Sequence, residues 1–186
     1  MNVYDFDNTI YDGDSTADFY LFCLKRHKKI LALSPSLLGA VIRYYVFRRG
    51  DKTKMKQVMY RFLTKIDSEK DIADFWSSHL RNIKDWYRRQ QRDDDIIISA
   101  SPYFLLRPAC DTLGIKYLTA SDVDVKTGIY SGKNCHGEEK VRLFRERYGG
   151  DIDEFYSDSH SDDPLAKISK KAFLVKGDRI LDWDKK

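Results

Sequence analysis

The stretch DIIIS at residues 95–99 places three consecutive isoleucines between an aspartate and a serine. Continuous β-branched runs of this kind are typical of strands buried on both faces of a parallel sheet. Pro102 suits the first turn of a helix, and we expect that helix to run to Leu113 before Gly114 ends it. The stretch therefore predicts a strand followed by a helix, the repeating unit of an α/β domain.

The same alternation extends in both directions along the chain. The predicted elements are strands at 1–6, 116–119, 153–157 and 171–175, a small hairpin at 124–130, and helices at 138–148 and from Asp163-Pro164 onward. Alternation of this kind is typical of a doubly wound sheet. The fold class is thus predicted to be α/β, with a doubly wound parallel-sheet (Rossmann-like) core.

Between the first strand and residue 95 the apolar period changes to that of helices. Apolar residues in 55–66 and in 72–87 each fall on one helical face, and Asp51 and Ser68 stand where N-caps belong. Further helices are expected at about 16–31 and 36–48. The pattern predicts an all-helical insertion after the first strand.

Charge is distributed unevenly over the 186 residues, whose formal net charge is +4. Residues 13–92 carry 18 Lys and Arg against 8 Asp and Glu, while the rest of the chain carries 15 against 21. The basic part could attract an anionic substrate, nucleic acid or a membrane surface. The apolar stretch 30–47 is interrupted by Pro35 and Arg43 and falls short of the about 20 apolar residues of a membrane span, so we expect a buried or interfacial helix.

The compartment is predicted from the N-terminus and the cysteines. Acidic residues occupy the start of the chain, where a secretory signal would need a basic and then an apolar segment. Cys23, Cys110 and Cys135 are odd in number and widely spaced, which favours free thiols over a disulfide framework. Both features predict a cytoplasmic protein.

Polar residues follow the predicted strands at the positions where a ligand would bind. They are Asp5 and Asp7 after the first strand, Ser99 after the isoleucine run, Lys140 in the helix at 138–148, and Asp158 with Asp162 after the strand at 153–157. Because the carboxyl ends of parallel strands share one crevice, we expect these side chains to meet. The set predicts a site for a cation and a phosphate group.

Each residue type has a role in such a site. Asp5, the backbone carbonyl of Asp7, and Asp158 would supply oxygen ligands for Mg²⁺. Lys140 and the Ser99 hydroxyl would hold phosphate oxygens. A carboxylate in line with phosphorus can form an aspartyl-phosphate, which makes Asp5 the candidate nucleophile, and Asp7 the candidate acid–base.

These residues resemble the four motifs of the haloacid-dehalogenase superfamily. The matching segments are DFDNT at 5–9, SAS at 99–101, Lys140, and YSDSHSD at 156–162. The helical insertion after the first motif resembles that of the phosphoserine-phosphatase-like subfamily. The resemblance implies Mg²⁺-dependent phosphomonoester hydrolysis, a core of residues 1–13 and 93–186, and a mobile helical cap of residues 14–92. It also implies supporting roles for Thr9 and for Asp162, which would orient Lys140.

The sequence departs from the family pattern at three positions. Asn8 and Ser157 stand where smaller residues are frequent, and neither change removes a ligand. Asp14 occupies the position of a glutamate that meets the substrate amine in phosphoserine phosphatases, so it is a weak candidate for substrate selectivity. The arginine that grips the substrate carboxylate could be Arg43, Arg48, Arg49 or Arg61. The expected substrate is a small or amphiphilic phosphorylated metabolite.

Three alternatives remain open at the level of the sequence. The same intermediate could serve a phosphotransferase, and the basic, apolar cap could belong to a membrane-surface lipid-phosphate phosphatase with peripheral membrane contact. A nucleic-acid-binding module could use the basic insertion, but that function needs no Asp5, Asp7 and Asp158, and no nucleic acid is expected as a partner.

Other acidic and histidine residues receive simpler interpretations. Asp95 is expected in a solvated turn and Asp163 at the N-cap of the helix that Pro164 begins. His79 lies on an apolar helical stripe and is expected in the core, whereas His160 lies inside the last motif and is a candidate for the pocket wall.

Overall fold

The computed structural model describes residues 1–33, 37, 39 and 52–184. The helix predicted at 36–48, the N-cap predicted at Asp51 and most of the apolar stretch 30–47 therefore lie outside the described residues. Within the described ranges, no helix is long and apolar enough to cross a membrane.

The core is a sheet whose strands follow the order β3-β2-β1-β4-β5-β6 within the described chain. The strands are β1 (Asn2–Tyr4), β2 (Ile96–Pro102), β3 (Tyr117–Ser121), β4 (Ile152–Ser157), β5 (Ser169–Lys176) and β6 (Arg179–Asp182). All neighbouring pairs are parallel except β5 and β6, which are antiparallel. The predicted parallel α/β core is confirmed, and β6 is an addition to it.

Alternate residues of the strands pack against different helices. Val3, Ile96 and Phe155 form one cluster with α7 (Glu138–Arg147) and α8 (Asp163–Ile168). Tyr4 and Ile97 face the other way, toward α6 (Tyr103–Thr112). Because a strand's side chains alternate in direction, this two-sided burial explains why the strands are apolar throughout rather than at every second residue.

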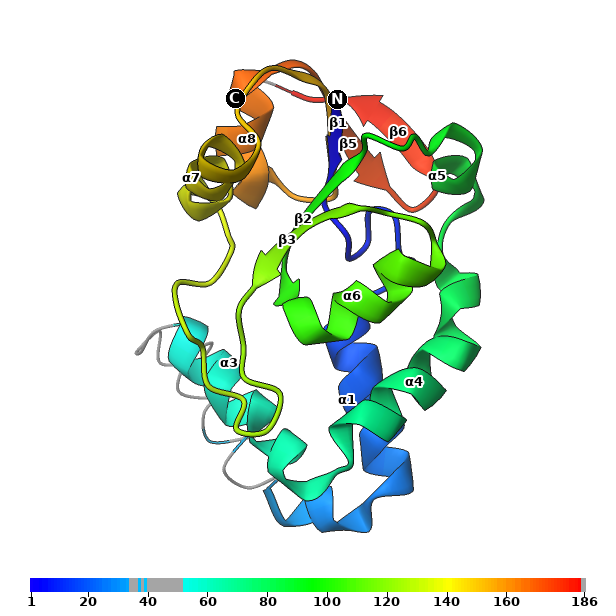
Figure 1. The fold of residues 1–186 in the computed structure, drawn as a ribbon, viewed down its shortest axis with the longest axis vertical. Coiled ribbons are helices and arrows are strands. Elements are labelled where there is room, and N and C mark those ends of the chain that lie inside the picture. The colour runs from blue at the N-terminus through cyan, green and yellow to red at the C-terminus, as the bar shows by residue number, and fades with distance from the viewer. Residues whose placement is uncertain (34–36, 38, 40–51, 185–186) are drawn as a thin grey trace.

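The remaining helices come from the insertion. They are α1 (Ser15–Arg26), α3 (Lys52–Tyr60), α4 (Ser68–His79) and α5 (Asp85–Gln90), with short 3₁₀ helices at Lys28–Leu33, Arg61–Lys65 and Leu80–Asn82. Figure 1 shows α1, α3 and α4 gathered at the end of the molecule away from the N-terminus. α1 and α4 meet through a cluster of aromatic rings, in which Phe75 lies 5.4 Å from Phe19 between ring centroids.

The helix predicted over 72–87 is divided in the structure. The single helix expected over 72–87 ends at His79, and a 3₁₀ turn and α5 complete the segment. The N-cap of α4 is Asp67, whose carboxylate accepts a hydrogen bond from the Lys70 amide, rather than Ser68. Apolar period alone does not separate one long helix from two short ones with a bend between them.

Helix α5 packs on the sheet rather than on the other inserted helices. The Tyr87 ring lies 5.0 Å from Tyr4, and Trp86 lies 5.6 Å from Tyr156. These contacts place the last part of the inserted segment beside the core strands. The division into a core of 1–13 and 93–186 and a cap of 14–92 stays a prediction.

Asp95 is buried, contrary to the solvated turn expected there. Its side chain is 1% exposed, and one carboxylate oxygen accepts a hydrogen bond from the Arg92 amide at 2.9 Å. Burial raises the pKa of the Asp95 carboxyl to about 6. His79 was predicted to lie in the core; it is half-buried and stacks on the core residue Phe75 at 4.2 Å between ring centroids.

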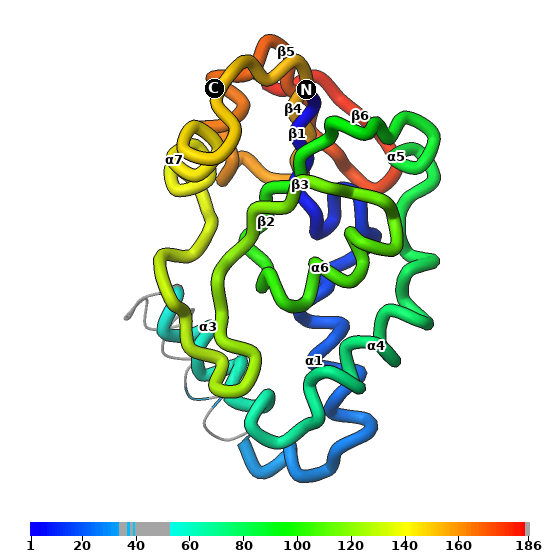
Figure 2. Tube along the Cα trace, viewed as in Figure 1, coloured from blue at the N-terminus to red at the C-terminus, as the bar shows by residue number. Residues whose placement is uncertain are grey.

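A long connection joins the sheet to the inserted helices. Figure 2 shows the segment after β3 running alongside α3 before it returns to α7. The expected hairpin is a turn in this segment, closed by a bridge between Val123 and Tyr130. The Gly128 amide bonds to the Asp124 carbonyl, and a Cβ on Gly128 would lie 2.6 Å from the Cβ of Tyr60, the last residue of α3. The turn therefore supports α3 directly.

Replacing Gly128 with alanine should destabilise the protein more than the same change at Gly114. Both glycines have a left-handed φ, +74° and +73°, but nothing lies within 4 Å of a Cβ at Gly114. G114A should reduce the free energy of unfolding by about 1–2 kcal/mol through backbone strain. G128A should reduce the free energy of unfolding by about a further 1–3 kcal/mol, because the new Cβ clashes with Tyr60. Urea unfolding measures both, and equal losses would contradict the close contact.

Candidate active site

The candidate site lies where the chain order of the strands reverses. From β1 the sheet grows to one side through β2 and β3, and then to the other side through β4. Ligand crevices form at such switch points, beyond the carboxyl ends of the strands. Here a cavity of about 360 Å³ opens, lined by Asp5, Asp7, Asn8, Asp14, Thr16, Ala17, Met55, Lys56, Met59, Ser99, Ala100, Ser101, His136, Lys140, Asp158, Ser161 and Asp162.

A buried ammonium group joins two of the predicted acidic residues. Lys140, which is 2% exposed, donates to Asp5 Oδ1 at 2.8 Å and to Asp162 Oδ2 at 2.7 Å. The Ser157 hydroxyl donates to the same Asp162 oxygen at 2.8 Å. The first strand, the helix α7 and the loop after β4 are thereby connected through side chains, as the motifs predicted.

The electrostatics of this group favour a charged lysine. Burial opposes the ammonium charge, but Asp5 and Asp162 outweigh it and raise the pKa of Lys140. Burial also raises the pKa of Asp5 to about 7, although Lys140 opposes that shift. One lysine thus does not fully balance the acidic residues of the cavity, because Asp7 and Asp158 line it as well.

Asp7 is held by two hydrogen-bond donors from different parts of the chain. The Ser15 amide, at the first residue of α1, donates to Asp7 Oδ1 at 2.7 Å, and the Ser101 hydroxyl donates to Oδ2. Burial and the nearby Asp14 raise the pKa of Asp7, the two donors lower it, and the result is about 6. A carboxyl with a pKa near neutrality suits a general acid–base.

Ser99 and Ser101 lie where β2 becomes irregular. The strand continues to Pro102 rather than ending at Ser99, and its register with β3 shifts between Ser99 and Pro102. The Ser101 amide donates to Ser99 Oγ at 3.1 Å, and the Ser101 hydroxyl donates to Asp7 of the first motif. The sequence predicted Ser99; the role of Ser101 as a donor to Asp7 was not predicted, although its motif was identified.

The other predicted residues have more varied positions. Asp158 lines the cavity, and burial raises the pKa of its carboxyl. Thr9 is fully buried behind the first motif and does not line the cavity. Asp14 lines the cavity and also caps α1, because its carboxylate accepts a hydrogen bond from the Ala17 amide at 2.9 Å.

The lining residues that were not predicted from the sequence include three from α3 and one from the segment before α7. Met55, Lys56 and Met59 come from α3, and Lys56 Nζ donates to the Ala100 carbonyl at 3.3 Å. His136 comes from the segment before α7. Helical spacing groups Met59 with Met55 (i, i+4) and with Lys56 (i, i+3), but it does not place that face at the cavity. Arg61 is exposed and does not line the cavity; Arg43, Arg48 and Arg49 lie outside the described residues.

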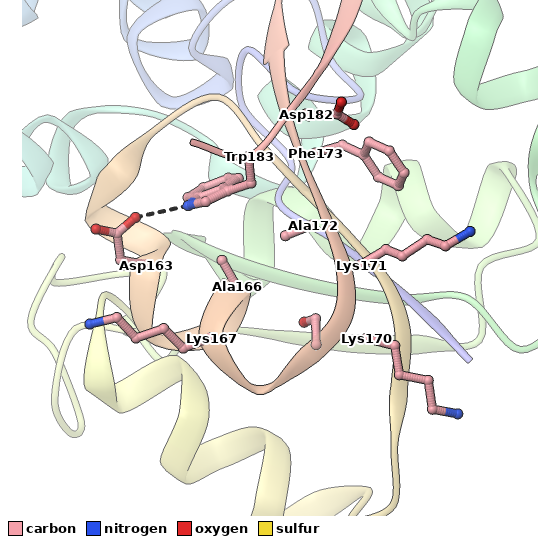
Figure 3. A pocket seen from close by; sticks show the side chains of 10 residues that line it. Asp163, Ala166, Lys167, Lys170, Lys171, Ala172, Phe173, Asp182 and Trp183 are labelled. Atoms are coloured by element: carbon pink, nitrogen blue, oxygen red, sulfur yellow. Dashed lines mark hydrogen bonds between the residues drawn. The ribbon is translucent and has the colours of Figure 1, made fainter. Parts of the chain in front are cut away.

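Asp163 and His160 belong to a different environment. Asp163 is the first residue of α8 rather than its N-cap, and it accepts hydrogen bonds from His160 at 3.1 Å and from the Trp183 indole at 3.0 Å. Figure 3 shows the Asp163–Trp183 bond at the edge of a second cavity, of about 430 Å³, between α8 and β5. His160 lines neither cavity, and none of the predicted catalytic residues lines the second one.

The donor set of the first cavity fits a divalent cation. Asp162 Oδ1 is buried without a hydrogen-bond partner among the described residues, and Asp5, Asp7 and Asp158 leave excess negative charge there. A bound cation with its water shell would balance that charge and supply the missing donor. No group of three or more His, Cys, Asp or Glu residues in the described ranges forms a metal site. The ligands that the sequence suggests are two carboxylates and one backbone carbonyl, and this set does not require a group of three such side chains.

The comparison with known families identifies the chain. The model of the haloacid dehalogenase-like hydrolases matches residues 3–167. The chain belongs to this family. No curated protein sequence matches it.

Solved structures show the same fold at low sequence identity. A protein of unknown function from Bordetella pertussis is 18% identical with a TM-score of 0.72, and the match covers 92% of this chain and 87% of that one. A phosphoserine phosphohydrolase-like protein from Francisella tularensis is 16% identical, with a TM-score of 0.58 and coverage of 92% and 86%. A phosphoserine phosphatase, solved as a phospho-aspartyl intermediate analogue, is 14% identical, with a TM-score of 0.51 and coverage of 91% of this chain and 83% of that one. The predicted fold resemblance to the phosphoserine-phosphatase-like subfamily is confirmed.

Replacing Lys140 with methionine should destabilise the fold strongly. The change leaves Asp5 and Asp162 buried without their shared cation, and breaking such a pair costs about 3–5 kcal/mol. The matched control is K116M, because Lys116 is 62% exposed and pairs with Asp93 only at 3.7 Å. Urea unfolding at pH 7 should show a large loss for K140M and little change for K116M. Parental stability of K140M would contradict the buried ion pairs.

Proposed function

We propose that this haloacid dehalogenase-like hydrolase is a Mg²⁺-dependent phosphatase that hydrolyses phosphomonoesters through a phosphorylated Asp5. The observation that carries the proposal is the shared cavity of Asp5, Asp7, Ser99, Lys140 and Asp158. Membership in a hydrolase family favours an enzyme over a nucleic-acid-binding module. The two phosphoserine phosphatase-like folds named above are consistent with this reaction class.

In the first step an Asp5 carboxylate oxygen attacks the phosphorus of the substrate. The new bond joins Asp5 to phosphorus while the bond from phosphorus to the leaving oxygen breaks. Asp7 transfers its proton to that oxygen, which leaves as an alcohol. Lys140, already bonded to Asp5 Oδ1 at 2.8 Å, and the hydroxyl of Ser99 stabilise the negative oxygens of the transferred group.

In the second step water hydrolyses the aspartyl-phosphate. Asp7, now a carboxylate, takes a proton from the water as it attacks phosphorus, and the bond between Asp5 and phosphorus breaks. Inorganic phosphate leaves, Asp5 returns as a carboxylate and Asp7 is protonated again. The Ser15 amide and the Ser101 hydroxyl hold Asp7 in place for both transfers.

Mg²⁺ would be held by Asp5, the Asp7 carbonyl and Asp158, and when bound it supplies charge neutralisation for the phosphoryl group. Asp162 supports this arrangement by orienting Lys140, with which it shares a hydrogen bond of 2.7 Å. Thr9 is buried within the first motif, and its hydroxyl has no hydrogen-bond partner among the described residues, so its supporting role stays a prediction.

The substrate is a small or amphiphilic phosphorylated metabolite. Met55 and Met59 give the cavity an apolar wall, and Lys56 adds a cation on the same helix. We propose Lys56 for the role for which the sequence offered only arginines. Asp14, the N-cap of α1, lines the same cavity. Transfer to an alcohol instead of water would use the same residues, and added acceptor alcohols would reveal it as a phosphorylated product.

Replacing Asp5 with asparagine should abolish turnover without unfolding the protein. The amide keeps the size of the side chain but removes the nucleophilic oxygen. A screen of phosphorylated metabolites with Mg²⁺ should find substrates for the parent, and phosphate release by D5N should be lost. Rapid acid quenching should trap phosphate on Asp5 in the parent only.

The matched control is D93N, because Asp93 is 97% exposed and lies outside the cavity. D93N should retain parental rates. Phosphate trapped on a residue other than Asp5, or full activity of D5N, would contradict the proposed reaction.

A further inference from the structure

The turn between β5 and β6 contacts both loops that carry the acidic residues of the site. Lys176 Nζ donates to the backbone carbonyl of Asp158 at 2.6 Å. The carbonyl of the next residue, Gly177, accepts a hydrogen bond from Lys84 Nζ at 2.7 Å, and Lys84 Nζ also donates to the carbonyl of Asn8 at 2.8 Å. Hydrogen bonds therefore run from the loop after β1 to the loop after β4 through two lysines and one turn.

Lys84 is unusual because it is a buried lysine that bonds to the main chain. It is 6% exposed and lies between the 3₁₀ turn at Leu80–Asn82 and α5, where the inserted helices return to the sheet. Its amide donates to the Ile10 carbonyl at 2.8 Å, so both ends of the residue hold the first-motif loop. Burying an ammonium group is costly, and its bonds to carbonyl groups offset that cost only while the main chain stays in place.

The loop that Lys84 holds has a backbone conformation that needs support. Asn8 follows Asp7 and has a φ of +56°, which few residues other than glycine adopt. Its amide donates to the Gly13 carbonyl at 2.7 Å, and its carbonyl accepts from Lys84. With both groups bonded, the two peptides that flank Asn8 are held, and the first of them joins Asn8 to Asp7.

We propose that Lys84 and Lys176 are positioning residues, which hold the Asp7–Asn8 loop and the Asp158 loop at a fixed separation through Gly177. We call Lys84, Lys176 and Gly177 the hairpin brace. The inference rests on the proposed function, since the separation of the two loops matters for chemistry only if both act on one ligand. Neither lysine lines the catalytic cavity, so the brace acts through the main chain.

The kinetic test uses K84M and K176M, which remove the ammonium groups and keep long apolar side chains. Loss of a partner that orients ligand residues reduces activity or metal affinity by about 10- to 100-fold. We expect kcat to fall by about that factor, KM to change little, and the Mg²⁺ concentration for half-maximal activity to rise. A merely structural lysine would lower the melting temperature without these changes.

The matched control is K70M, which removes a lysine that is 63% exposed and pairs with Asp74 on one helix. It should keep the parental kcat and Mg²⁺ dependence. K176M decides the test if K84M fails to fold, because Lys176 is exposed. Parental kcat and Mg²⁺ dependence of a folded K176M would overturn the proposal.

A double variant tests whether the two lysines form one unit. If both lysines act through Gly177, the loss of kcat in K84M/K176M should be about equal to the loss in the less active of the two single variants. Losses that multiply would show two independent contacts and would overturn the brace.

Hydrogen exchange separates the brace from the proposed reaction, because it needs no substrate. Amides in peptides covering 8–14 and 158–162 should exchange faster in K84M and in K176M than in the parent or K70M. Faster exchange with an inactive parent would uphold the brace and contradict the phosphatase function. Unchanged exchange with an active parent would contradict the brace alone.

Discussion

The buried ammonium group of Lys140 is the interaction on which the rest of the site depends. It donates to Asp5 from β1 and to Asp162 from the loop after β4, and it is itself on α7. Two carboxylates could not remain in this apolar surrounding without a cation, and a lysine could not remain there without its carboxylates. The three segments must therefore come together in one arrangement, and that arrangement forms the floor of the cavity.

The sheet order explains why residues so far apart in the sequence meet. β1 lies between β2 and β4, so Asp5 after β1, Ser99 within β2 and Asp158 after β4 come from three adjacent strands. The inserted helices leave the core directly after the first motif and return directly before α5. Ser15 at the start of α1 and Lys84 near the end of the insertion thus both bond to the first-motif loop. The helical part is connected to the reacting groups at both of its junctions with the core.

The sequence predicted the elements whose residues carry a periodic signal. The isoleucines of β2 and the motifs at the strand ends were sufficient for the fold and for bringing Asp5, Asp7, Lys140 and Asp158 to one cavity. β6 was missed because its four residues are all exposed and give no apolar alternation. Asp95 was misjudged because its burial depends on packing from distant segments rather than on its acidic neighbours. Lys56, Ser101 and Lys84 could not be identified from spacing, since their partners are backbone or side-chain groups far along the chain.

A crystal structure grown with Mn²⁺ and beryllium fluoride would test the central claim most directly, because the metal gives an anomalous signal and the fluoride complex imitates a phosphoryl group on a carboxylate. The account predicts one strong anomalous peak at coordination distance, about 2.0–2.3 Å, from Asp5, the Asp7 carbonyl and Asp158. It also predicts the fluoride complex on Asp5, beside the Lys140 ammonium. A peak elsewhere, or a complex on another carboxylate, would contradict the account.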